Sequence, residues 1–437
     1  MKPRSRKRVV LPVLVVLVLA VAVVITVRAI TSVHIAPIGD AEIAAVSSEF
    51  KPVEAAEPTV PSNTISEIVE SPDAIREGDF DMRGWLPARL GEIRASTSVT
   101  DALQRATKGK RLAPGDPNWE NDRETIESCY EAQLKAEAIY DPNRCCRAAC
   151  GAADYCSFLT RSHLSNGDVD QDVEYRLFKA IETAIASGVM SVRQVHDIYA
   201  RLTPAPAEDV GLANKFRREF ADKFLPLCLS FQRSHDADGI LKAVFQGSLD
   251  TRNLAVGDFD VRQTVAEAAD EARAEVKNAS RPWVRRDEGP GKRMRREMDS
   301  APAPPNPGPA DSWLSKMWAR IKYQAGMRSI PNSLGRTLFH LFDFHPNELS
   351  SSIAWRTDIE AHRLIVLLQL YKQMHRGSLP TTLGELASID PSIPMPRDLY
   401  SGGEFLYSAA NHKFWSVGEN GKDDGGSFSL DRSWPIP

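Results

Sequence analysis

Six cysteines carry the most reactive side chains of this sequence, and five of them fall between positions 129 and 156. An even number of clustered cysteines in an oxidising compartment is typical of structural disulfides, and six cysteines allow fifteen pairings. We expect bridges that join the helix carrying Cys129 to the segment with Cys145, Cys146, Cys150 and Cys156, while Cys228 ties in a distant helix.

A zinc site that uses the same cysteines, with His163 as a further ligand, is the alternative. Zinc motifs usually contain C-x2–4-C pairs, and redox dithiols usually contain C-x-x-C. Here the spacing is C-C-x3-C-x5-C, without any C-x-x-C. The pattern therefore favours disulfides over zinc.

A second group with metal chemistry lies near the C-terminus, in the glycine-rich segment 419–426. Asp423, Asp424 and Asn420 offer hard oxygen ligands on a segment that glycines allow to bend sharply, and such ligands suit Ca2+. The alternative is a turn in which the same side chains bond only their own backbone. Both interpretations remain open from the sequence.

Compact catalytic signatures are absent from the sequence. It contains no G-x-S-x-G, no G-x-x-x-x-G-K-[ST], no H-E-x-x-H and no G-x-G-x-x-G motif. A non-catalytic role is therefore favoured. The alternative is an enzyme whose acid–base pair is hidden among unpatterned Asp, Glu and His residues.

Five basic residues before position 9 are followed by 19 uncharged residues, Val9 to Val27. At about 1.5 Å per residue this run measures ~28 Å, close to the ~30 Å of a bilayer core. Signal-peptide apolar regions are usually only ~7–15 residues long, so a retained transmembrane helix is favoured over a cleaved signal. The basic residues predict a cytoplasmic N-terminus and an extracytoplasmic remainder.

Composition excludes fibrous, collagenous and wholly disordered classes, since 42% of the 437 residues are hydrophobic and the net charge is only -4. Two segments break the pattern: 31–84 is acidic and contains prolines, and 281–311 is first basic and then Pro-rich. We interpret them as an extended spacer and a linker. The expected outward location argues against a nucleic-acid partner for the basic stretch.

The region 85–280 predicts helices, because apolar residues recur at spacings of three and four. The clearest helix is expected over Glu174 to Ser187, with Gly188 as its stop. Others are expected around Val192 to Tyr199, along Phe216 to Leu227, and over Val261 to Asn278.

The C-terminal part, 312–437, has a different pattern. The stretch from Ala354 to His375 predicts a helix that is apolar on nearly all sides and therefore buried, yet too short for a second span. Two short strands are expected over Phe405 to Tyr407 and Lys413 to Val417, separated by a turn.

The last 75 or so residues contain a recognisable set of glycines, aromatic residues and acidic residues. They are Tyr371, Gly377, Leu379, Pro380, Leu383, Leu386, Pro396, Asp398, Ser401, Gly402, Phe405, Tyr407, Phe414, Trp415, Ser416, Gly418, Asn420, Gly421, Asp423, Asp424, Gly425 and Gly426. With these residues, the segment resembles the C-terminal globular region of the major pseudopilin of type II secretion. It is more similar still to membrane-anchored bacterial proteins, common in planctomycetes, that end in such a module and have no agreed activity. The resemblance implies calcium binding by Asp423 and Asp424. Because the processing motif of pseudopilins is missing, it does not imply assembly into a pilus.

Together these observations predict a mainly α protein: a tail and transmembrane anchor over 1–30, a spacer over 31–84, a helical cysteine-containing domain over 85–280, a linker over 281–311, and an α+β module with a short antiparallel hairpin over 312–437. The expected location is the inner membrane, spanned once by residues 9–27, with the C-terminus periplasmic. The expected role is structural or protein-binding in the cell envelope, related to secretion, with an unidentified protein partner; the alternative is an envelope hydrolase.

Overall fold

The computed structural model describes residues 34–53, isolated positions between 127 and 134, and residues 142–166, 171–234, 258–286, 330–341, 346–391, 394–427 and 429–437. These residues are mainly helical and include a small antiparallel sheet near the C-terminus, as the sequence predicts. The chain forms two compact units, and neither is a consecutive stretch. The first unit comprises 1–52, 216–275 and 288–344, and the second comprises 53–215, 276–287 and 345–437.

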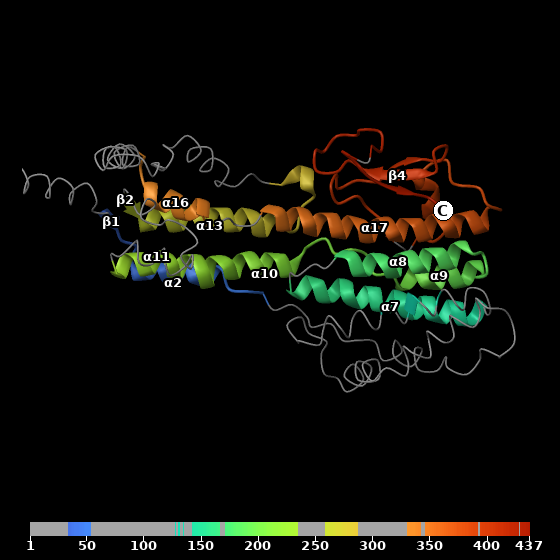
Figure 1. The fold of residues 1–437 in the computed structure, drawn as a ribbon, viewed down its shortest axis with the longest axis horizontal. Coiled ribbons are helices and arrows are strands. Elements are labelled where there is room, and N and C mark those ends of the chain that lie inside the picture. Colours follow the sequence, from blue (N-terminus) through green and yellow to red (C-terminus); the bar gives the residue numbers. More distant parts are fainter. Residues whose placement is uncertain are drawn as a thin grey trace, which may run out of the picture. The chain divides into compact units, whose positions relative to one another are not determined.

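The first unit is built on phenylalanine packing. Phe220, Phe224, Phe231 and Phe259 are fully buried in its core, and the ring centroids of Phe231 and Phe259 lie 5.6 Å apart. Its elements are β1 (His34–Ala36), α2 (Asp40–Glu49), the π-helix η1 (Glu219–Phe224), α11 (Leu225–Ser234), β2 (Asp258–Asp260) and α16 (Ser333–Leu341), together with most of α13 (Val261–Asn278) (Figure 1).

The start of the predicted acidic spacer is folded, which corrects the expectation of an extended chain there. Strand β1 pairs in parallel with β2, with Ile35 opposite Phe259, and α2 follows directly. Phe50 is buried against Phe220. Arg273 donates hydrogen bonds from Nε and Nη2 to the Glu49 carboxylate, at 2.5 and 2.8 Å. Apolar anchors at the ends of this short segment offset its ordering entropy, despite its acidic composition. Residues 54–84 lie outside the described part.

The second unit is organised around the long helix α17 (Pro346–Met374). In Figure 1, α8 (Gln171–Ala186) and α9 (Val192–Arg201) lie along one side of it and the small sheet lies on the other. Helix α7 (Pro142–Asn166) packs on α8 and α9. The unit also holds the 3-10 helices η3 (Trp283–Arg285) and η4 (Leu383–Ser388), and most of α10 (Val210–Arg218).

The helices predicted over Glu174 to Ser187, Val192 to Tyr199 and Val261 to Asn278 are confirmed, and the one expected along Phe216 to Leu227 is helical but includes the π-helix η1. Leu177, Ile181 and Ile185 of α8 face the core, and Gly188 ends the segment at a φ of 73°. Ser191 caps α9 through a capping box with Gln194. Helix α13 has the expected bounds.

The C-terminal sheet has the order β3 (Leu406–Ser408), β4 (Lys413–Ser416), β5 (Arg432–Pro435). The predicted hairpin is the antiparallel pair β3–β4, with Tyr407 opposite Phe414. Strand β5 was not predicted; it places Trp434 against Phe405 and Phe414, with centroids 5.6 and 5.4 Å away. This aromatic cluster belongs to the same core as α17.

Of two further predicted segments, the membrane span lies outside the described residues and the linker falls partly within them. No described helix combines the length and apolar character that crossing a membrane requires, and residues 9–27 are not among those described. The first residues of the predicted linker are folded: the Trp283 backbone N–H donates to Leu399 O at 3.1 Å, and its indole donates to Glu419 O at 2.7 Å.

Candidate functional site

The glycine-rich loop between β4 and β5 holds all three predicted calcium ligands. Gly418 begins it at a φ of 62°, and a Cβ there would lie 2.5 Å from the Leu430 carbonyl oxygen. Only glycine combines that conformation with so close an approach. The loop is thereby folded tightly against the start of β5.

Each predicted ligand is bonded within the loop or to the adjacent strand β4. Asp423 Oδ1 accepts from Trp415 Nε1 at 3.0 Å and from the Gly425 N–H at 2.9 Å, and these bonds lower the pKa of the Asp423 carboxyl. Asn420 donates its amide to Asp424 Oδ2 at 2.6 Å, and its own oxygen accepts from Lys422 N. Within the described residues, no group of three or more His, Cys, Asp or Glu side chains is arranged to hold a metal ion.

Asp431 is a buried carboxylate of this loop that the sequence analysis missed. It is only 4% exposed, and its Oδ2 accepts from the Asp424 and Gly426 N–H groups at 3.0 and 2.8 Å. Its Oδ1 is buried and has no hydrogen-bond partner among the described residues. A buried carboxylate oxygen without a partner is costly and is a position where a cation would be stabilising.

Lys413 already brings a positive charge to the loop. Its ammonium donates to Gly425 O at 2.8 Å and Gly426 O at 3.3 Å, and lies 5.1 Å from the Trp415 ring centroid. Backbone carbonyls of this kind are also calcium ligands. A bound calcium ion and the Lys413 ammonium would therefore compete for the same oxygens.

Other residues that carry the resemblance build the module instead of lining a site. Asp398 is buried; its Oδ1 accepts from Tyr400 N at 2.9 Å and from the Ser416 hydroxyl at 2.6 Å, and its Oδ2 accepts from Ser401 N. Tyr407 donates its hydroxyl to Pro380 O at 2.8 Å. These bonds tie irregular segments to the sheet, which gives a structural reason for each residue.

The five described cysteines form no disulfide with one another. Cys145, Cys146, Cys150 and Cys156 lie on α7 in the second unit, whereas Cys228 is fully buried in the core of the first unit, where burial raises the pKa of its thiol. Cys129 and the His163 side chain lie outside the described residues, so bridges that use Cys129 and the zinc alternative with His163 stay predictions.

A stripe of buried polar side chains on α17 was not foreseen. Glu360 Oε1 accepts from the Ala205 N–H at 2.5 Å and Oε2 from the Arg397 N–H at 3.2 Å, while Arg363 Nη1 donates to both oxygens at 3.1 and 2.9 Å. Burial raises the pKa of the Glu360 carboxyl, against the opposing effect of Arg363 and the backbone donors. Glu360 therefore links two irregular segments to the helix.

The same stripe continues toward the N-terminal end of α17. Arg356 Nη1 donates to the Pro206 and Ala207 carbonyl oxygens, each at 3.2 Å, and Ser352 donates to Asp209. The segment between α9 and α10 is irregular, so its backbone groups lack the hydrogen bonds of a helix or sheet. Arg356 supplies the partner that two of its carbonyl groups need.

A histidine–carboxylate pair lies elsewhere on α17. His362 Nδ1 is 2.5 Å from Glu182 Oε1, and the side chains are 3% and 1% exposed. Phe178 stacks on the imidazole with centroids 4.8 Å apart. His362 Nε2 has no hydrogen-bond partner within the described part of the chain. The pair has the chemistry of a general base, but it is sealed in the core.

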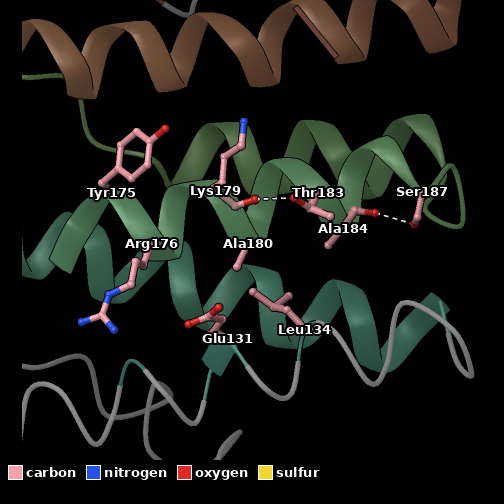
Figure 2. A pocket seen from close by; sticks show the side chains of 9 residues that line it. All are labelled: Glu131, Leu134, Tyr175, Arg176, Lys179, Ala180, Thr183, Ala184 and Ser187. Atoms are coloured by element: carbon pink, nitrogen blue, oxygen red, sulfur yellow. Dashed lines mark hydrogen bonds between the residues drawn. The ribbon is translucent and has the colours of Figure 1, made fainter. Parts of the chain in front are cut away.

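A pocket of about 350 Å³ lies along α8 (Figure 2). Two of its hydroxyls are already used: Thr183 donates to Lys179 O and Ser187 to Ala184 O, each at 2.7 Å. Lys179 also lines it and donates to Glu182 at 3.3 Å. The lining residues are Glu131, Leu134, Tyr175, Arg176, Lys179, Ala180, Thr183, Ala184 and Ser187, so Glu360 and His362 are not among them. The hydroxyls of Thr183 and Ser187 therefore bond backbone carbonyls and not a base.

Comparison with known proteins adds no relative. No family model, no curated protein and no solved structure matches the chain. Arguments about function therefore rest on the residues and their geometry.

Proposed function

We propose that the chain is a single-pass membrane-anchored extracytoplasmic protein that binds a protein partner in the cell envelope and catalyses no reaction. The observation that carries this proposal is the use of Glu360, the buried carboxylate with a raised pKa: its oxygens are bonded by Arg363, Ala205 and Arg397, and it lines no part of the pocket on α8. A catalytic carboxylate has to reach a substrate, and Glu360 instead holds the fold together.

One observation favours the rival, an envelope hydrolase. The Glu182–His362 pair resembles the part of a hydrolytic triad that orients and activates a base. Its burial argues against that role, because the base must lie within hydrogen-bond reach of a substrate proton. We therefore assign the pair to packing between α8 and α17.

Binding is assigned to the C-terminal module. Support comes from the loop between β4 and β5, which carries exposed Lys422 and Leu430 beside the buried Asp431 carboxylate. We propose that calcium draws together the carboxylates of Asp423, Asp424 and Asp431, which are not arranged around one point in the structure, with Asn420 as a further candidate ligand, and thereby orders this loop for its partner. The resemblance of the module to the major pseudopilins supports the same assignment and a role related to secretion.

The membrane topology is tested by a fusion of alkaline phosphatase after Pro437. We expect an active enzyme, because positive charge before residue 9 should retain the N-terminus in the cytoplasm and the phosphatase folds only outside it. The measurement is phosphatase activity, compared with a cytoplasmic reporter at the same position. Activity of the cytoplasmic reporter would contradict the proposed orientation.

The binding role is tested by a photo-crosslinking amino acid at Lys422 of the full-length chain in its native cell. We expect a discrete crosslinked product, since Lys422 is exposed on the proposed binding loop. The matched control places the same amino acid at Arg193, an exposed residue of α9 in the same unit.

The product should require Asp431, since that side chain holds two backbone N–H groups of the loop. Absence of any product at position 422, or equal products at 422 and 193, would contradict binding by this loop. Hydrolytic activity that is lost in His362→Gln would favour the rival.

A further inference from the structure

We infer that Cys146 and Cys150 form a two-thiolate site for a soft monovalent metal ion, of which Cu(I) is the biological example. The two residues lie one turn apart on α7, at positions i and i+4, so their side chains share a face of the helix. They are 9% and 7% exposed, and their thiols are hydrogen-bonded to each other. The proposal is independent of the calcium loop and of partner binding.

An intact helix keeps this pair from forming a disulfide. Side chains at i and i+4 have Cβ atoms ~5–6 Å apart, whereas a disulfide needs Cβ atoms ~3.5–4.5 Å apart. A metal ion can span the wider gap, because two metal–sulfur bonds of about 2.3 Å separate the sulfurs by up to ~4.6 Å. Helix α7 therefore keeps the two thiols too far apart for a disulfide, but close enough for a metal ion to bind between them.

Two basic residues, Arg201 and Arg147, and one acidic residue, Asp197, are the charged groups that act on Cys146. Binding of one monovalent ion releases both thiol protons and leaves a complex of charge -1. Arg147, an exposed residue of α7, would help to balance that charge, whereas Arg201 is already paired with Asp154.

The number of ligands selects the ion. No set of three or more His, Cys, Asp or Glu side chains in the described residues is arranged around a metal, so structural zinc, which takes four ligands, does not fit this pair. Thiolates select soft ions, and among the biological ones Cu(I) is stable with two of them.

The test is an anaerobic titration of the full-length, reduced chain with Cu(I) against a coloured Cu(I) chelator. We expect one equivalent of Cu(I) to be withdrawn from the chelator, with two sulfur neighbours by X-ray absorption. The double variant Cys146→Ala plus Cys150→Ala should lose this equivalent, whereas Cys228→Ala should keep it, since Cys228 lies in the core of the other unit.

A second measurement uses the wild-type chain, so its result does not depend on whether the variants fold. Bound Cu(I) should protect Cys146 and Cys150 from alkylation, measured by mass spectrometry of peptides after brief exposure to N-ethylmaleimide. Failure of the wild-type chain to withdraw Cu(I), unchanged binding by the double variant, or three or more sulfur neighbours would overturn the proposal.

Discussion

Replacement of Arg363 by Met is expected to lower the free energy of unfolding of the second unit by about 3–5 kcal/mol, the usual cost of removing one partner of a buried ion pair. The guanidinium and the Glu360 carboxylate are 2% and 5% exposed and 2.9 Å apart. Met fills similar space but leaves a buried carboxylate with only its backbone donors. At roughly 2–4 °C per kcal/mol, calorimetry should show a melting temperature lower by about 6–20 °C.

The matched control is Arg201→Met in the same unit. Arg201 pairs with Asp154 at 2.6 Å, but the two side chains are 39% and 19% exposed, so the expected loss is below about 1 kcal/mol. The double variant Glu360→Gln plus Arg363→Met should melt above Arg363→Met alone, because no unpaired charge remains buried. Equal melting of the Arg363→Met and Arg201→Met variants would show that the buried pair does not link the irregular segments to α17.

Calcium is expected to raise the melting temperature of the second unit in the full-length chain. At a concentration 100 times its dissociation constant, an ion that binds only the folded state stabilises by about 2.7 kcal/mol. The measurement is calorimetry in calcium and in chelator, with the difference as readout. Asp431→Asn should abolish the difference, as should Asp423→Ala combined with Asp424→Ala, since each removes negatively charged ligands from the proposed site.

Lys413 allows a sharper version of this experiment. If its ammonium occupies the carbonyl oxygens that calcium would use, Lys413→Met should enlarge the calcium-dependent shift. Lys422→Met removes the same charge from an exposed loop position and should leave the shift unchanged. Identical melting of the wild-type chain in calcium and in chelator would show that the loop is only a turn.

Helices with a regular apolar period were predictable from the sequence, and very short strands were not. Helix α8 has its core residues at spacings of three and four, and α13 follows the same rule along its whole length. Strands β1 and β2 have three residues each, too few to show an alternation. Strand β5 contains Pro435 at its end, and proline usually marks a break. Its place is determined by Trp434, whose aromatic partners lie on other segments.

The candidate site was predictable only where its residues are adjacent in the chain. Asp423 and Asp424 stand out beside glycines, whereas Asp431 acquires its role by folding back onto Asp424 and Gly426. Glu360 and Arg363 are charged residues in a helix that the sequence predicts to be buried, and the sequence does not show which groups they would bond. Glu360 is buried because it accepts hydrogen bonds from the backbone N–H groups of Ala205 and Arg397. These two residues are distant from Glu360 in the sequence, so the helical period does not reveal the contacts.

The dependence of α8 and α9 on α17 has a consequence during biosynthesis. Helix α9 ends at Arg201 and α17 ends at Met374, so the residues that cover α8 and α9 are translated much later. At about 5–20 residues per second, the delay is on the order of 10–35 s. Throughout that interval the apolar faces of the early helices lack their partner and are prone to aggregate. We expect a chaperone that binds the exposed apolar faces to assist folding of the nascent chain. Ribosome-bound chains halted before position 346 should be far more sensitive to protease than chains that have been translated through position 437.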